Sequence, residues 1–133
     1  MITADTNLVV ALLVPSPDTA LAREAFRKDS EWIAPLLWRS EFRNVLVTVM
    51  RRGEMELADA RRLSAIAERL FQGREWLVRS ERVLELAASS GCTAYECEFV
   101  AVAEEARVPL VTDDHDLLNA FPDVAISPKN FAG

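Results

Sequence analysis

The chain has 133 residues, half of them hydrophobic, and carries a net charge of -6 at neutral pH. This length and composition support a sizeable core and argue against disorder, so we expect one domain over residues 1–133. The acidic balance excludes a protein that grips nucleic acid by bulk positive charge, unless divalent ions bound to clustered carboxylates reverse the local sign.

Short apolar segments alternate with helical ones along the chain. In order, the sequence predicts a strand over 1–4, helices over 8–14 and 18–28, a strand over 32–34, helices over 35–52 and 56–72, a strand over 75–78, helices over 80–90 and 93–107, a strand over 109–112, a helix over 113–121 and a strand over 124–126. Asp18 or Ser16 can cap the second helix, and Gly53 can end the third. This alternation predicts an α/β fold whose mostly parallel sheet is covered on both faces.

The two cysteines, Cys92 and Cys97, show no metal-binding spacing, and His115 is the only histidine. We expect reduced thiols in a cytoplasmic protein. The apolar run at residues 8–14 is too short to cross a membrane, and no basic residue precedes it, so no membrane association is expected.

Acidic side chains follow two of the predicted strands. Asp5 comes directly after the first, and Asp113 and Asp114 come directly after the fourth. In a parallel sheet these positions share the carboxyl edge, where open α/β folds bind their ligands. The alternative is that Asp5 and one of the other two only cap the helices that follow.

Glu41 lies in an apolar stripe of the third helix, on the same face as Trp38 and Val45. A carboxylate there must be paired, protonated or bound to metal, because burying it alone is costly. A salt bridge to Arg39 or Arg43 would be a purely structural explanation, although both arginines point to another side of the helix.

Glu96 shares the apolar face of its helix with Phe99, and two explanations stay open for it. With Thr93 it forms a capping-box pattern, in which the glutamate bonds back to the N–H of the cap residue. The same geometry places Glu96 at the open end of the helix, near the edge of the sheet. Glu98 and Glu105, by contrast, look like ordinary solvated acids.

Acids that converge on one crevice repel one another without a counter-ion. Hard divalent cations remove this repulsion, and a site of carboxylates without His or Cys suits Mg²⁺ or Mn²⁺ rather than Zn²⁺. The sequence therefore predicts an acidic metal site, without identifying its substrate.

Taken together, residues 2–7, the helix with Glu41, residues 93–103 and residues 110–114 resemble the PIN-domain family, in particular the VapC-like toxins of toxin–antitoxin pairs. Each motif alone is weak, but their order and spacing are fairly specific and cover nearly the whole chain. Asp5, Glu41 and Asp114 match acidic positions of the family. Glu96 stands where the family usually has Asp, which puts metal geometry and rate in doubt.

The resemblance implies a three-layer α/β/α PIN-like domain with a central parallel sheet of about five strands. It implies a Mg²⁺- or Mn²⁺-dependent endoribonuclease that acts on RNA, forms a homodimer and is blocked by a cognate antitoxin. The residues it assigns to metal binding and catalysis are Asp5, Glu41, Glu96 and Asp114. The residues it assigns to supporting the ligands or the substrate are Thr6, Asn7, Thr112 and Asp116.

The third helix leaves two questions open. Its basic residues can contact RNA phosphates or form ordinary salt bridges: Arg39, Arg43, Arg51 and Arg52. Its apolar residues exceed what one sheet face needs and can contribute to a dimer interface: Phe42, Leu46, Val49 and Met50. The tryptophans are expected in the core: Trp32, Trp38 and Trp76.

Rival classes fit less well. A haloacid-dehalogenase-like phosphatase needs Asp where the chain has Asn7, and a receiver domain needs Asp where it has Arg79. A catalytically inactive PIN-like module that binds RNA or a partner protein is the remaining alternative, and Glu96 in place of Asp is the feature that points to it.

Overall fold

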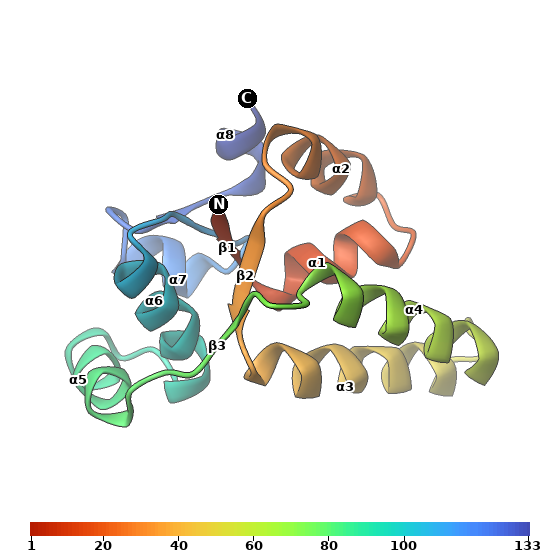
Figure 1. The fold of residues 1–133 in the computed structure, drawn as a ribbon, viewed down its shortest axis with the longest axis horizontal. Coiled ribbons are helices and arrows are strands. Elements are labelled where there is room, and N and C mark those ends of the chain that lie inside the picture. Colours follow the sequence, from red (N-terminus) through yellow and green to blue (C-terminus); the bar gives the residue numbers. More distant parts are fainter.

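A five-stranded, all-parallel sheet forms the centre of the structure, a computed structural model that describes residues 1–133 (Figure 1). The strands lie in the order β3-β2-β1-β4-β5. Their bounds are Ile2–Ala4 for β1, Trp32–Pro35 for β2, Glu75–Trp76 for β3, Leu110–Val111 for β4 and Ala125–Ile126 for β5. The central strands β1 and β2 are buried along their whole length, as expected for a sheet covered on both faces.

Eight helices surround the sheet. Their bounds are Thr6–Leu13 for α1, Thr19–Lys28 for α2, Leu37–Arg51 for α3, Leu57–Leu70 for α4, Ser80–Ser90 for α5, Ala94–Ala106 for α6, His115–Ala120 for α7 and Pro128–Ala132 for α8. α1, α3 and α4 lie on one side of the sheet, whereas α5, α6 and α7 lie on the other (Figure 1). The predicted three-layer α/β/α architecture with five parallel strands is therefore confirmed. None of the helices combines the length and the apolar composition that a membrane span requires.

The sequence missed one helix, misplaced the starts of α1 and α3, and assigned α2 a cap that is absent. Pro35, predicted to open the third helix, ends β2 instead, and α3 begins at Leu37. α8 was not predicted, although Ser127 caps it through the backbone N–H of Asn130. α1 begins at Thr6, so the predicted polar turn is its first turn. The side chain of Asp18 stands at the N-cap position of α2 but caps nothing, because its backbone is already helical; the predicted capping of α2 by Asp18 is wrong.

The apolar residues of α3 are largely used inside the molecule. Phe42 and Leu46 are buried in the main core, against which α4 also packs. These two side chains are therefore not available for the predicted dimer interface, whereas Val49 and Met50 are half-buried. Trp32 and Trp38 are core residues as predicted, whereas Trp76, also expected in the core, is only half-buried.

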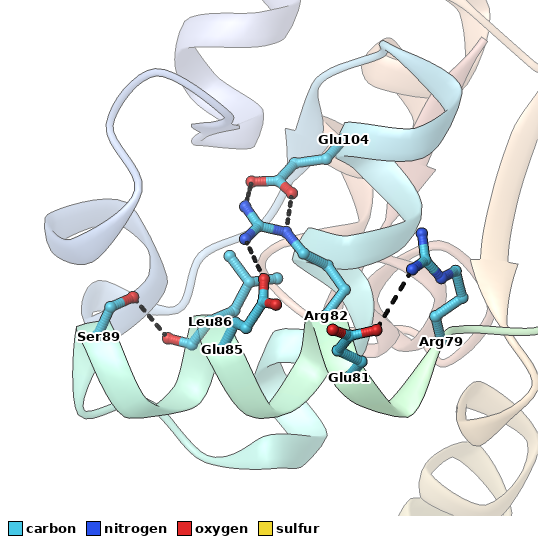
Figure 2. Close-up of polar contacts among 7 residues, drawn as sticks. All are labelled: Arg79, Glu81, Arg82, Glu85, Leu86, Ser89 and Glu104. Atoms are coloured by element: carbon cyan, nitrogen blue, oxygen red, sulfur yellow. Dashed lines mark hydrogen bonds and ion pairs between the residues drawn. The ribbon is translucent and has the colours of Figure 1, made fainter.

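Arg82 joins α5 to α6 on the far side of the sheet. Its guanidinium donates two hydrogen bonds to Glu104 on α6, at 2.9 and 3.0 Å, and a third to Glu85 on its own helix at 3.0 Å (Figure 2). Arg79 and Glu81 form a looser, fully exposed pair at 3.6 Å. The bidentate pair fixes α5 against α6, the helix that carries Glu96 near its first turn.

Arg39 fixes α3 against β3 and α4. It donates hydrogen bonds to both carboxylate oxygens of Glu75, at 2.6 and 2.7 Å, and one to Glu68 at 3.0 Å. The indole N–H of Trp38 donates to Glu75 at 2.9 Å, and these contacts lower the pKa of the Glu75 carboxyl. Arg39 is therefore committed to this network, which favours the salt-bridge alternative over a phosphate contact at this residue.

We expect Arg39→Met to lower the free energy of unfolding by about 1–3 kcal/mol, because charged hydrogen bonds to Glu75 are lost while Glu75 stays largely buried. Urea denaturation at neutral pH measures this. The matched control is Arg62→Met, which removes an exposed pair with Asp59 and should cost less than about 0.5 kcal/mol. Equal losses in the two variants would contradict a structural role for the Arg39 network.

Candidate active site

Two acids meet where β1 and β4 end, because these strands are parallel neighbours in the sheet. Thr112, directly after β4, connects them. Its hydroxyl donates a hydrogen bond to Oδ2 of Asp5 at 2.6 Å and accepts one from the backbone N–H of Asp114 at 3.0 Å. The predicted convergence of the two strand ends is therefore present, and the buried Thr112 holds it together.

Asp5 is a helix cap and a pocket residue at the same time. Its Oδ1 accepts the N–H of Thr6 at 2.7 Å, while Oδ2 receives the hydroxyl of Thr112. Burial raises the pKa of Asp5 to about 6; the hydrogen bonds from Thr112 and Thr6 oppose this rise, and the charges of Glu41 and Asp114 add to it. The capping explanation is thus correct without excluding a second role.

Glu41 reaches the same region from α3. Its Oε1 accepts the hydroxyl of Thr6 at 2.6 Å. Partial burial raises its pKa, and the nearby charge of Glu96 raises it further. Neither of the two arginines pairs with Glu41, because Arg39 is held by Glu75 and Arg43 forms no ion pair, so the salt-bridge explanation is wrong.

Glu96 caps α6 and also lies close to Asp114 and Asp116. The capping box of α6 is complete, with the N–H of Thr93 donating to Oε1 of Glu96 at 2.9 Å and the N–H of Glu96 donating to the Thr93 hydroxyl at 3.0 Å. At the same time, Glu96, Asp114 and Asp116 can bring one carboxylate oxygen each within 4.8 Å of one another. Asp114 also caps α7 through Oδ1, which leaves its Oδ2 without a hydrogen bond.

These acids line one pocket of about 550 Å³, which we call the acidic pocket. Its lining residues are Asp5, Thr6, Asn7, Val10, Ala11, Ser16, Asp18, Glu41, Val45, Glu96, Phe99 and Asp114. The four predicted acids are thus together, with Thr6 and Asn7 beside them. Thr112 is buried behind Asp5, and the exposed Asp116 lies beside Glu96 and Asp114.

Sequence reasoning missed part of this lining. Val10 and Ala11 stand three and four positions after Asn7, on one face of α1, so helical spacing from Asn7 would have found them. Ser16 and Asp18 lie beyond the helix in a loop, and no pattern in the sequence marks their return to the pocket. Glu98 was expected to be solvated, but it is half-buried, and burial and the charge of Glu41 raise its pKa.

The donor set fits a hard divalent cation. The acidic pocket offers carboxylate oxygens from four elements and no imidazole or thiol, and such oxygens are the ligands that hard divalent cations prefer. Both cysteines are buried and free, and His115 is exposed. The residues present therefore fit Mg²⁺ or Mn²⁺ and give no support to zinc.

The fold is parallel α/β, and its acidic pocket lies where β1 and β4 end. A model of the PIN domain family matches residues 2–124, and the chain belongs to this family. PIN domains are generally nucleases, and they typically bind divalent metal ions.

Solved structures share the fold at low sequence identity. The crystal structure of PAE2754 from Pyrobaculum aerophilum matches with a TM-score of 0.76 and 22% identity, over 98% of this chain and 92% of that one. A toxin–antitoxin complex from Klebsiella pneumoniae matches with a TM-score of 0.72 and 17% identity, over 96% of this chain and 98% of that one. Among curated proteins, none is detectably similar in sequence.

Proposed function

We propose that the chain is a Mg²⁺- or Mn²⁺-dependent endoribonuclease that hydrolyses RNA phosphodiester bonds, and that it is the toxin of a type II toxin–antitoxin pair. One observation carries the proposal: within a PIN fold, acids from four separate places in the sequence line a single pocket. The similarity to a toxin–antitoxin complex supports the toxin assignment.

In this proposal Asp5, Glu41, Glu96 and Asp114 hold the ion directly or through water. A bound ion lowers the pKa of its water and offsets charge on the phosphate. The Thr112 hydroxyl and the Thr6 N–H keep the Asp5 carboxylate in one orientation, as outer groups do around metal ligands. A carboxylate of the pocket accepts the proton of the attacking water.

The test is cleavage of tRNA and mRNA substrates by the purified chain with Mg²⁺, with Mn²⁺ and with EDTA. Cleavage that needs the metal and stops with EDTA supports the proposal. Binding of RNA or of a partner protein without any metal-dependent cleavage would instead favour the inactive module, for which Glu96 in place of Asp is the motivating feature.

Glu96→Gln separates capping from metal binding. Glutamine also satisfies a capping box, so we expect thermal stability without metal to change little. Loss of the charge should reduce cleavage by about 10- to 100-fold, if Glu96 ligates the ion. Glu105→Gln, an exposed change on the same helix, is the control. Unchanged cleavage in Glu96→Gln would limit Glu96 to capping.

The proposed protein partners are a cognate antitoxin that blocks the acidic pocket and a second copy of the chain. The similarity to a toxin–antitoxin complex supports the first. Co-purification with the product of a neighbouring gene tests the antitoxin. Light scattering on the purified chain, whose mass is 14.8 kDa, tests the homodimer.

A further inference from the structure

The acidic pocket is larger than a metal site needs. Its volume of about 550 Å³ falls within the range of roughly 300–1,000 Å³ that is usual for small-molecule sites. It follows α1 from Asp5 at the start of the helix, past Val10 and Ala11, to Ser16 and Asp18 beyond its end. The chain turns back after α1, where the Thr19 hydroxyl donates to the carbonyl of Ala11 at 2.7 Å, so Asp18 lies near the later turns of that helix.

The acidic pocket also has apolar walls. Val10 and Ala11 on α1 and Val45 on α3 are each only partly buried, and all three line the pocket. Small apolar side chains of this kind can pack against the face of an unstacked nucleobase. A phosphate at the acids would thus have a neighbouring base against these walls.

Asp18 lines the pocket from the loop after α1, and its exposed carboxylate has no protein partner. It occupies the N-cap position of α2, where aspartate normally accepts a backbone N–H, yet here it forms no capping bond and no ion pair. Its own N–H is bound by the hydroxyl oxygen of Ser16 at 3.2 Å, which fixes the loop locally. Both oxygens of Asp18 are therefore available to a ligand in the pocket.

We propose that this part of the pocket is a base-recognition subsite in which Asp18 selects guanine in single-stranded RNA. Guanine alone presents two adjacent N–H donors on its Watson–Crick edge, which match the two oxygens of a carboxylate. Adenine and cytosine place one amino group beside an acceptor, and uracil places one N–H between two acceptors, so each sets an acceptor against the carboxylate. This inference rests on the proposed ribonuclease function.

The test compares guanine preference in wild type and Asp18→Asn. Cleavage sites on a randomised single-stranded RNA are read by sequencing, and we expect enrichment of guanine next to the cut in wild type. Asp18→Asn should reduce this enrichment by roughly tenfold, because bidentate contacts to a base discriminate by about that factor or more. Asp123→Asn removes the same charge in an exposed loop outside the pocket and should leave the preference unchanged.

A second measurement separates this proposal from the cleavage itself. In NMR titrations without metal, guanosine, which carries no phosphate for the acids to repel, should shift the signals of Asp18, Ala11 and Val45 more than adenosine does, and Asp18→Asn should remove the difference. Cleavage without guanine preference, or a preference that Asp18→Asn leaves unchanged, overturns the subsite but not the ribonuclease. If wild type cleaves no RNA, the proposed ribonuclease function is wrong. Equal NMR shifts with guanosine and adenosine would overturn the subsite as well.

Discussion

Asp5→Asn is expected to reduce metal-dependent RNA cleavage by at least about 100-fold, a loss typical when a central charged group of a site is removed. Asp5 is the most buried of the pocket acids and lies between Thr6, Thr112 and the charge of Glu41. Asparagine keeps its shape and can still accept the Thr6 N–H, so the fold should survive. Initial cleavage rates with saturating Mn²⁺ measure the effect.

Stability gives this variant an independent control. The pKa of Asp5 is raised from 3.8 to about 6 in the folded chain, so folding favours its protonated form. That contribution is complete below pH 3.8 and is lost as the pH rises through about 6. Without metal, Asp5→Asn should therefore be at least as stable as wild type at pH 7.5, with an advantage that shrinks toward pH 4. An unfolded variant, or one with wild-type cleavage, would contradict the assignment.

The second large effect is stabilisation by the metal. At pH 7.5, a divalent ion at 100 times its Kd should raise the melting temperature by on the order of 10 °C relative to EDTA, because binding to the folded state adds about 2.7 kcal/mol. At pH 5 the shift should be smaller, because protons compete for Asp5 below its pKa of about 6. Differential scanning fluorimetry with Mg²⁺, Mn²⁺ and EDTA at both pH values measures this.

The control is the same experiment on Asp5→Asn, with NaCl added to match the ionic strength. The metal-dependent shift should largely disappear in that variant. A shift of equal size in both proteins would place the ion elsewhere on the acidic surface, and no shift in wild type at millimolar metal would argue against a built site.

The sequence predicts most of the fold because its signals are local. Apolar strands, the Thr93 capping box and the acids after β1 and β4 can all be read within a few residues. The parallel arrangement follows from the alternation of strands and helices, and it brings Asp5 and Asp114 to one edge without further information. Six of the pocket residues could be named before any coordinates, with the help of the family resemblance: Asp5, Thr6, Asn7, Glu41, Glu96 and Asp114.

The features that the sequence did not give depend on distant partners. The bidentate bond from Arg39 to Glu75 joins residues 36 positions apart, so spacing within α3 could not assign it. The five-residue helix α8 is held by docking on α2, where Lys28 donates to the carbonyl of Phe131 at 2.6 Å. Asp18 has the residue type of a helix cap, but its backbone geometry prevents capping and leaves the side chain at the pocket.

The central claim is that the four acids bind a divalent ion together, and diffraction from crystals grown with Mn²⁺ tests it most directly. Anomalous scattering should show an ion in the acidic pocket, bound directly or through water to Asp5 and Asp114, and Asp5→Asn crystals should lack it. A pocket without an anomalous peak at millimolar Mn²⁺, with Mn²⁺ bound only at other surface carboxylates, would contradict the claim.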